Sequence, residues 1–307
     1  MIVVFGSINV DLVFRVGSLP QSGETVLSPS HAVHPGGKGA NTAVASARAG
    51  SETHMVGRIG RDRLADDALR LLHDSGVGTA CVAESARPTG LATICVDRNG
   101  ANAIVVASGA NLDATASQVP EALLGADALV ALQMEVPAPE NWSLARRAKA
   151  AGARVMLNLA PVQPVTAQAL TDTDILVMNQ AEATALADAL QLPHDRPADT
   201  ARSLAGQYGM LCAVTLGHDG AVACDHDAAW RIPALPVKAV DTTGAGDAFC
   251  GCLAAALDQR LDIESALRYA AAGAGLACTV EGAQTGMPTR EAIRARVNEL
   301  PALERLA

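Results

Sequence analysis

Short apolar runs alternate along the whole chain with longer stretches in which apolar residues recur every three or four positions. The short runs predict buried strands at 2–6, 53–58, 126–132, 153–158, 174–178, 211–216 and 220–224. The longer stretches predict helices at 39–49, 62–75, 139–151, 180–190, 197–208, 246–258 and 263–278. Short apolar strands separated by helices are typical of a parallel sheet with helices on both faces. We therefore expect an α/β fold with a mostly parallel central sheet.

Two stretches depart from this alternation. Residues 10–34 and 89–107 show strand-like patterns without a helix between the strands. Asn99-Gly100 separates two β-prone runs, which is a strong hairpin signal. We expect these stretches to form a small sheet that covers a site at the carboxyl edge of the main sheet. An ordinary edge hairpin is the alternative.

Composition supports one large packed unit. Of 307 residues, 50% are hydrophobic and 18% charged, while aromatic residues make up only 2%, so alanine, valine and leucine must fill the core. We interpret residues 1–307 as a single domain. No apolar run reaches the length of about 18 residues that a membrane-spanning helix needs, and we expect no membrane partner.

Net charge and cysteine content indicate which partners and which cellular compartment to expect. A net charge of −9 argues against a nucleic-acid partner, although a local anion site stays compatible with it. The first residues are apolar without a basic segment or cleavage site, and we interpret them as a strand rather than a leader. Seven scattered cysteines without metal-site spacing indicate reduced thiols in a cytoplasmic protein.

The segment Val240–Gly251 is rich in chemistry. Thr242-Thr243-Gly244-Ala245-Gly246 forms a flexible turn that leads directly into an apolar helix pattern beginning near Asp247. Small residues at a helix N-terminus let backbone N–H groups surround an anion. A carboxylate beside bound phosphate suggests that Asp247 is a base, although Asp is also a preferred helix cap. The segment alone leaves both interpretations open.

A second glycine-rich segment, Pro35–Asn41, precedes another helix. It lacks the pattern of a phosphate-binding P-loop, because Ala32 and Gly39 stand where glycine and Ser or Thr are required. The Gly6 region likewise lacks the spacing of a dinucleotide fingerprint. Close backbone approach, a cationic Lys38 and the amide of Asn41 suit a polyhydroxylated small molecule.

Polar residues follow several predicted strands. They are Asn9 and Asp11, Gln133 and Glu135, Asn179 and Glu182, and Thr215, Gly217 and Gly220. Open α/β sheets bind ligands at the carboxyl ends of their strands, so these residues are candidates for a common site. Each also has a local explanation. Asn9 and Asp11 suit a turn, Glu182 suits the first turn of a helix, and the two glycines suit a hairpin.

Together these motifs resemble the ribokinase family of sugar and nucleoside kinases, also called the PfkB family. Gly36–Asn41 matches the family's Gly-Gly-(Lys)-Gly-x-Asn motif, and Asp241–Asp247 matches its Asp-Thr-x-Gly-Ala-Gly-Asp motif. The other polar strand ends and Gly282-Ala-Gln284 follow in the family's order, and the resemblance covers residues 1 to 300. Lys38 with Asn9 and Asp11 is most similar to the branch that phosphorylates ribose.

The resemblance implies a three-layer α/β sandwich with a β lid, and roles for individual residues. Asp247 would be the catalytic base, with the amides of Gly244, Ala245 and Gly246 as an anion hole. The sugar would be bound by Asn9, Asp11, Gly37, Lys38, Asn41 and Glu135. ATP would contact Asn179, Thr215, Gly217 and Gly220, and Glu182 would organise Mg²⁺ through water.

The resemblance also implies a K⁺ site and a homodimer. K⁺ would lie beside the anion hole and be bound mostly by backbone carbonyls, at Asp241, Thr243, Ala277, Val280, Gly282 and Gly286. The β lid, from residues 10–34 and 89–107, would mediate dimerisation.

The function expected from the resemblance is ATP-dependent phosphorylation of a pentose, with D-ribose converted to D-ribose 5-phosphate. One alternative keeps this chemistry with another acceptor: deoxyribose, fructose, adenosine, inosine or cytidine. A second alternative is a non-catalytic regulator that binds a sugar or nucleotide. The presence of Asp247 and an intact Gly244–Gly246 turn argues against that second alternative.

Overall fold

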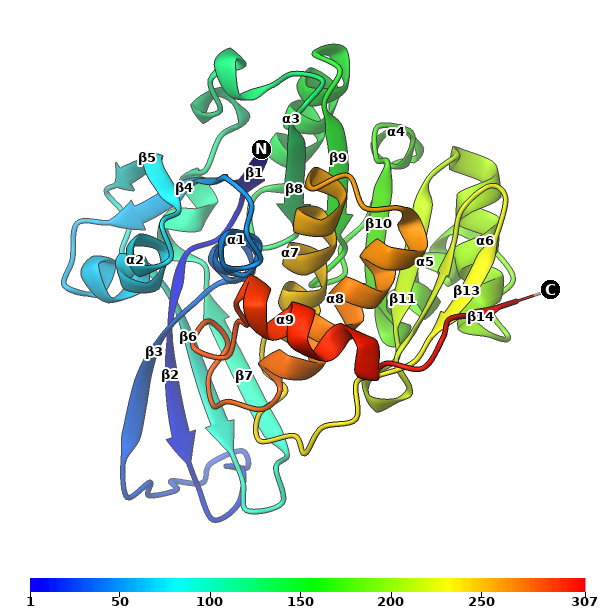
Figure 1. Ribbon diagram of the computed structural model, residues 1–307. Coiled ribbons are helices and arrows are strands. Elements are labelled where there is room, and N and C mark those ends of the chain that lie inside the picture. Colours follow the sequence, from blue (N-terminus) through cyan, green and yellow to red (C-terminus); the bar gives the residue numbers. More distant parts are fainter. Residues whose placement is uncertain (307) are drawn as a thin grey trace.

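The chain forms one large and one small β-sheet (Figure 1), seen in a computed structural model that describes residues 1–306. In spatial order, the large sheet contains β14 (Glu304–Arg305), β13 (Ala229–Ile232), β12 (Ala221–Cys224), β11 (Leu211–Thr215), β10 (Ile175–Asn179), β9 (Arg154–Asn158), β8 (Leu129–Gln133), β1 (Ile2–Phe5), β4 (Thr53–Gly60) and β5 (Gly78–Ser85). The strands from β11 to β5 pair in parallel, and β12, β13 and β14 continue the sheet antiparallel. The predicted mostly parallel sheet is confirmed.

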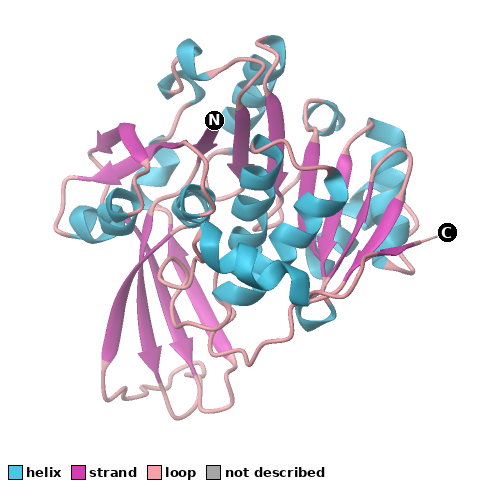
Figure 2. Ribbon diagram, in the orientation of Figure 1, coloured by secondary structure: helices cyan, strands magenta, loops and turns pink. Residues whose placement is uncertain are grey.

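Helices cover both faces of this sheet, giving three layers (Figure 2). One face packs against α1 (Lys38–Arg48), α2 (Leu64–Asp74), α7 (Ala245–Asp258), α8 (Ile263–Ala277) and α9 (Arg290–Arg296). The other packs against α3 (Ala138–Ala150), α4 (Ala167–Thr171), α5 (Gln180–Leu190) and α6 (Pro197–Tyr208). Strand β1 illustrates the division, because Ile2 and Val4 join the first core while Val3 and Phe5 join the second.

Small residues let α1 and α7 pack closely. A Cβ added to Gly251 of α7 would lie 2.5 Å from the Ala45 Cβ and 2.7 Å from the Thr42 carbonyl oxygen of α1. The contact depends on small side chains, which are frequent in this core because aromatic residues are scarce. It fixes the two helices side by side, so the residues at their N-termini, Lys38 and Asp247, face a common region.

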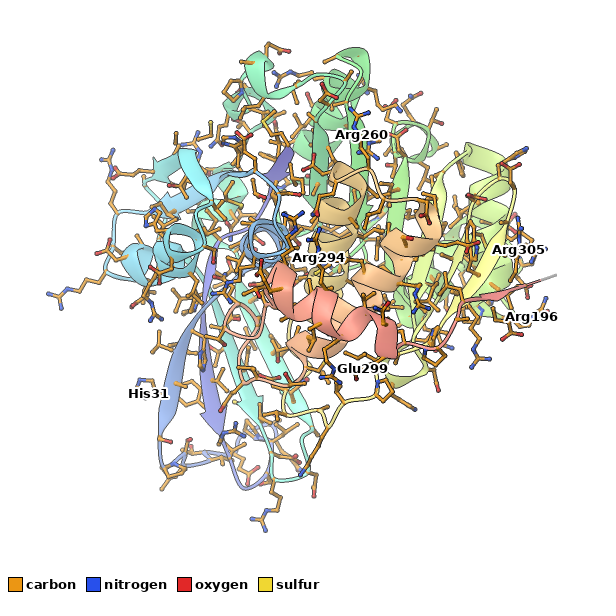
Figure 3. All side chains as sticks on the ribbon, viewed as in Figure 1. His31, Arg196, Arg260, Arg294, Glu299 and Arg305 are labelled. Atoms are coloured by element: carbon orange, nitrogen blue, oxygen red, sulfur yellow. The ribbon has the colours of Figure 1, made fainter. Side chains whose placement is uncertain are left out.

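The small sheet contains β3 (His31–Gly36), β2 (Asn9–Arg15), β6 (Gly90–Val96) and β7 (Asn102–Ala107), and it projects from the main body (Figure 1). The predicted Asn99-Gly100 hairpin is present. Asp97 Oδ1 accepts hydrogen bonds from the amides of Asn99 and Ala101, and Gly100 has a φ of 83°. In the outer part, the His31 ring (Figure 3) packs 5.9 Å from the Phe14 ring.

All the strands and helices predicted for the main body are present, with small differences at their ends. The pattern missed β5, β13, β14, α4 and α9. Strand β5 is partly exposed at the sheet edge, and the others are short or polar, so none produces a strong apolar signal. Short 3₁₀ helices occur at Gly109–Asp113, Ala116–Gln118, Glu121–Leu123, Gly217–Asp219 and Val297–Glu299. No helix among residues 1–306 has the length and apolarity required to cross a membrane.

Candidate active site

Asp247 lies in the first turn of α7 and is only 4% exposed. Its Oδ2 accepts a hydrogen bond from the Asn41 Nδ2 at 2.9 Å, and its Oδ1 accepts one from the Asn158 Nδ2 at 3.3 Å. Burial raises the pKa of the Asp247 carboxyl, while the Lys38 ammonium and the Asn41 amide oppose that rise. The arrangement holds a buried carboxylate beside a cation, with no cap bond to its own helix among the residues described.

Lys38, the first residue of α1, is electrostatically coupled to this carboxylate. Asp247 is the main cause that raises the pKa of the Lys38 ammonium, against the opposing effect of burial, and Glu135 adds to the rise. Glu135 follows β8, and its Oε2 accepts from the Ser7 hydroxyl at 2.6 Å and from the Lys38 backbone amide at 3.1 Å. The Lys38 ammonium therefore lies among several acidic groups at the carboxyl end of the central strands.

The glycine-rich segment before α1 packs against protein more than sequence reasoning expected. A Cβ on Gly39 would lie 2.7 Å from the Ser7 amide nitrogen, and Gly37, with a φ of 89°, lies against Ile8 and Asn9. These glycines let α1 begin directly on the chain that links β1 to β2. The close backbone contacts seen at Gly37 and Gly39 are with Gly6–Asn9 of the protein itself, and approach to a ligand stays a prediction.

Asp11 lies on β2 of the small sheet with its carboxyl group largely buried. Burial raises the pKa of Asp11 to about 7, with further contributions from Glu135 and Asp247 and an opposing one from Lys38. Asn9, on the same strand, accepts through its Oδ1 a hydrogen bond of 2.7 Å from Asn111. The small sheet thus contributes polar side chains to the same region as Lys38 and Asp247.

A cleft of about 720 Å³ separates the small sheet from the main body. Asp11, Val13 and Ile94 line it from the small sheet, and Asp241–Thr243 and Glu281–Ala283 line it from the body. An ion pair of 2.5 Å between Arg15 and Glu281 joins the two sides. The cleft therefore connects the Asp11 region to the turn that precedes α7.

The candidate nucleotide residues lie at the ends of the next strands. Asn179 of β10 and Thr215 of β11 are register partners. Asn179 Oδ1 accepts from the Glu182 amide, and Glu182 Oε2 accepts from the Asn179 amide, each at 2.8 Å, so the two residues form a capping box on α5. Burial raises the pKa of Glu182 despite the Asn179 hydrogen bond, and Glu182 is coupled electrostatically to Lys38 and Asp247.

Gly217 and Gly220 lie in the connection between β11 and β12, with φ values of 60° and 87°. A Cβ on Gly220 would lie 2.0 Å from the Ile232 carbonyl oxygen, so this glycine is required by packing. The hairpin explanation of both glycines is therefore correct for their conformation. Gly217 is exposed and lies beside the end of β11.

The turn before α7 presents backbone N–H groups. Gly244 precedes the helix with a φ of 76°. The Ala245 amide donates to the Thr242 carbonyl oxygen at 3.2 Å, whereas the amides of Gly244, Gly246 and Asp247 have no acceptor within residues 1–306. Sequence reasoning grouped Ala245 with the glycines. The geometry instead leaves the amides of Gly244, Gly246 and Asp247 free for an anion.

The six positions expected to hold a monovalent cation form one cluster. A Cβ on Gly286 would lie 2.6 Å from the Ala277 carbonyl oxygen, 3.2 Å from that of Gly282 and 3.4 Å from that of Val280. Asp241 Oδ1 accepts from the Thr243 amide at 2.9 Å, and its Oδ2 accepts from the Gly282 amide at 2.9 Å. Although burial opposes it, these hydrogen bonds lower the pKa of Asp241. Converging carbonyl oxygens next to a carboxylate fit a hard cation.

Sequence reasoning assigned no role to four polar residues of this region. Ser7 and Asn111 support Glu135 and Asn9, Asn158 binds Asp247, and the Gln284 Nε2 donates to the Gly36 carbonyl oxygen at 3.2 Å. Asn158 ends a predicted strand, so the rule that drew attention to Asn179 would have found it. Asn111 lies in a 3₁₀ helix and carries no comparable signal.

Comparison with known proteins agrees with this geometry. Residues 1–290 match the model of the pfkB family of carbohydrate kinases. The chain is 33% identical to a ribokinase of Lactococcus lactis over 97% of each chain, and 34% identical to a deoxyribokinase of Salmonella typhi over 94% of this chain and 96% of that one.

Among solved structures, it resembles Arabidopsis thaliana ribokinase complexed with ribose and ATP. The TM-score is 0.84 at 31% identity, over 96% of this chain and 98% of that one. Both the fold and the kinase class implied by the sequence motifs are thereby confirmed. The chain belongs to the PfkB family of carbohydrate kinases, and it is an ATP-dependent sugar kinase of the ribokinase type.

Proposed function

We propose that this kinase phosphorylates a pentose, D-ribose, at O5 to give D-ribose 5-phosphate. The observation that carries the proposal is the buried Asp247 carboxylate, which two amide side chains hold beside Lys38 at the N-terminus of α7. The ribokinases among its relatives support ribose as the acceptor.

In the proposed reaction, Asp247 accepts the proton of the O5 hydroxyl as that oxygen bonds to the γ-phosphorus of ATP. The bond between the γ-phosphorus and the bridging oxygen breaks, and ADP leaves. Charge that develops on the transferred group would be stabilised by the amides of Gly244, Gly246 and Asp247, which lack acceptors among residues 1–306. The Ala245 amide would join them only by giving up its bond to Thr242.

The sugar hydroxyls would be bound by residues from three elements. Asp11 and Asn9 reach the site from the small sheet, Lys38 and Asn41 from α1, and Glu135 from the end of β8. Carboxylates accept hydrogen bonds from hydroxyl groups, while the ammonium of Lys38 donates to their oxygens. Gly37 contributes close backbone approach. The Asn41 Oδ1 is buried without a partner among the residues described, which leaves an acceptor for the substrate.

The nucleotide would lie along the ends of β10 and β11, near Asn179, Thr215, Gly217 and Gly220. Glu182 fits Mg²⁺, which favours oxygen ligands and commonly binds through water together with substrate phosphates. When bound, Mg²⁺ would neutralise phosphate charge near Lys38. The local roles of Asn179 and Glu182 in capping are compatible with this function, because each side chain keeps a further polar atom.

A K⁺ site is proposed at the carbonyl oxygens of Ala277, Val280 and Gly282 with Asp241, Thr243 and Gly286 around them. The carbonyl convergence near Gly286 supports it. When bound, K⁺ would supply positive charge beside the anion-binding turn. Asp241 connects the two regions, since it accepts from both Thr243 and Gly282.

The small sheet is proposed to act as a lid on a single domain, residues 1–307, and to join two copies in a homodimer. Strand β7 is an edge strand in which every residue is exposed, and Val105 is 71% exposed. An apolar, exposed edge strand is a pairing surface. We also place the enzyme in the cytoplasm, because its seven cysteines are all free thiols.

The alternatives concern the acceptor. Deoxyribose is supported by the deoxyribokinase relative, whereas fructose, adenosine, inosine and cytidine have weaker support. A screen of ATP consumption over ribose and these five alternatives, followed by ³¹P NMR of the product, tests the proposal. We expect the highest kcat/KM with ribose and a product phosphorylated at O5. A higher kcat/KM with another acceptor would make that compound the substrate in place of ribose, and no turnover with ribose would overturn the proposal.

A further inference from the structure

The Asp247 carboxylate is bound from two different elements of the fold. Asn41 reaches its Oδ2 from α1, and Asn158 reaches its Oδ1 from the carboxyl end of β9. Because a carboxylate oxygen only accepts hydrogen bonds, the amide nitrogens of both asparagines face it. The motifs that resemble the kinase family include Asn41 but not Asn158.

Asn158 is the last residue of a central strand rather than part of a loop. It is 7% exposed, and β9 lies between β8 and β10, where Asn158 pairs in register with Gln133 and Val177. A side chain at the end of a central strand has little freedom to follow a moving ligand. Its position is set by the sheet rather than by α1 or the small sheet.

Two donors on two oxygens constrain the carboxylate in a way that one donor does not. The terminal torsion of an aspartate side chain is broad, so a single hydrogen bond leaves the carboxylate plane free to rotate. The second donor fixes that plane relative to the N-terminus of α7. A neutral amide achieves this without adding a charge to a site that already contains several acidic groups.

The charged and titratable groups that face Asp247 come from several elements. They are Lys38 on α1, Asp11 on β2, Glu135 after β8, Glu182 on α5 and Cys250 on α7. Lys38 is the cation among them, and the acids favour a protonated Asp247. A hydrogen bond from a neutral donor favours the ionised form, because the donated hydrogen stabilises negative charge.

We propose that Asn158 is a positioning residue for proton transfer: its amide fixes the orientation of the Asp247 carboxylate and keeps it ionised. This inference rests on the proposed function, in which Asp247 takes the proton of the acceptor hydroxyl. Asn158 acts through Asp247 and so affects turnover more than sugar binding.

The test compares Asn158→Leu, which is close in size and lacks the donor, with Asn158→Ser, which keeps a hydroxyl donor. Thr200→Val is the control, since Thr200 is also a buried residue and its hydrogen bond, to the Pro193 carbonyl oxygen, lies far along the chain on α6. For Asn158→Leu we expect kcat to fall about 10- to 100-fold, as for loss of a hydrogen bond to a charged group, with little change in KM. The apparent pKa of the acid limb of its pH–rate profile should rise by about one unit. Asn158→Ser should show a smaller fall in kcat and a smaller shift of the acid limb than Asn158→Leu. Thr200→Val should change neither kcat nor the acid limb.

A second measurement does not depend on activity. The ¹³C signal of the Asp247 carboxyl carbon, assigned by its absence in Asp247→Asn, is titrated in the wild type and in Asn158→Leu. We expect the midpoint to be higher in Asn158→Leu. An unchanged midpoint together with an unchanged acid limb would overturn the role of Asn158. If the wild-type protein phosphorylates no sugar, the proposed function fails, while the titration still decides whether Asn158 controls Asp247.

Discussion

Gly36 and Asp11 lie on the paired strands β3 and β2, so close that a Cβ on Gly36 would come within 2.2 Å of the Asp11 Oδ2. The absent side chain at Gly36 is therefore what leaves room for the Asp11 carboxylate. Sequence reasoning connected the glycines of this segment with a ligand. At Gly36 the neighbour that needs the space belongs to the protein itself.

This relationship predicts that Gly36→Ala impairs sugar binding. The new methyl group must displace Asp11, and we expect KM for ribose to rise more than about tenfold, with a smaller change in KM for ATP. Steady-state kinetics with each substrate varied in turn measures both values. Gly206→Ala is the control, because a Cβ there meets open space on α6 and should leave KM unchanged. A wild-type KM in Gly36→Ala would show that Asp11 is not constrained in this way.

Asp11 also makes stability depend on pH. Its folded-state pKa, about 7, lies above the ordinary value of 3.8, so the folded state binds the extra proton. The stability that this proton contributes is present at low pH and is lost as pH rises through about 7. Asp11→Asn replaces the acid by a neutral amide and removes that loss. The free energy of unfolding should therefore rise by up to about 4 kcal/mol at pH 8.

The measurement is thermal unfolding of Asp11→Asn and the wild type at pH 5 and pH 8. We expect the variant to gain stability over the wild type by more at pH 8 than at pH 5, while its KM for ribose rises. An equal difference at both pH values would contradict the raised pKa. The two measurements distinguish the effect of the buried Asp11 carboxyl on stability from its effect on sugar binding.

The carbonyl cluster predicts a dependence on K⁺. Replacing K⁺ by Na⁺ at constant ionic strength should lower kcat of the wild type. Gly286→Ala places a methyl group 2.6 Å from the Ala277 carbonyl oxygen and should abolish the difference between the two ions. Gly125→Ala, where a Cβ meets nothing within 4 Å, should respond like the wild type. An equal kcat of the wild type in K⁺ and in Na⁺ would contradict the proposed cation site.

The exposed edge of the small sheet predicts dimerisation. Val105→Glu places a charge on β7 and should shift the protein towards a monomer in sedimentation velocity. Leu261→Glu changes an exposed apolar residue between α7 and α8 and serves as the control. If both variants and the wild type sediment as monomers, the small sheet is not a dimer interface.

The sequence predicted the layers and the strand ends of the site well, because these depend on local apolar periodicity and on short motifs. It could not predict the bonds from Asn41 and Asn158 to Asp247, since these join residues 206 and 89 positions apart. The roles of Gly36 and Gly39 were likewise hidden, because each depends on which distant segment packs against it, Asp11 of β2 for Gly36 and the link Gly6–Ser7 for Gly39. The engagement of the Ala245 amide with Thr242 also requires the actual turn geometry.

The central claim is that Asp247 is the base of a ribose kinase, and Asp247→Asn tests it most directly. The variant keeps the size of the side chain but cannot accept the proton. We expect calorimetry to give ribose binding within a few-fold of the wild type, and quenched-flow assays with ATP and ribose to give a kcat lower by about 10²- to 10⁴-fold. Wild-type turnover in Asp247→Asn would contradict the account.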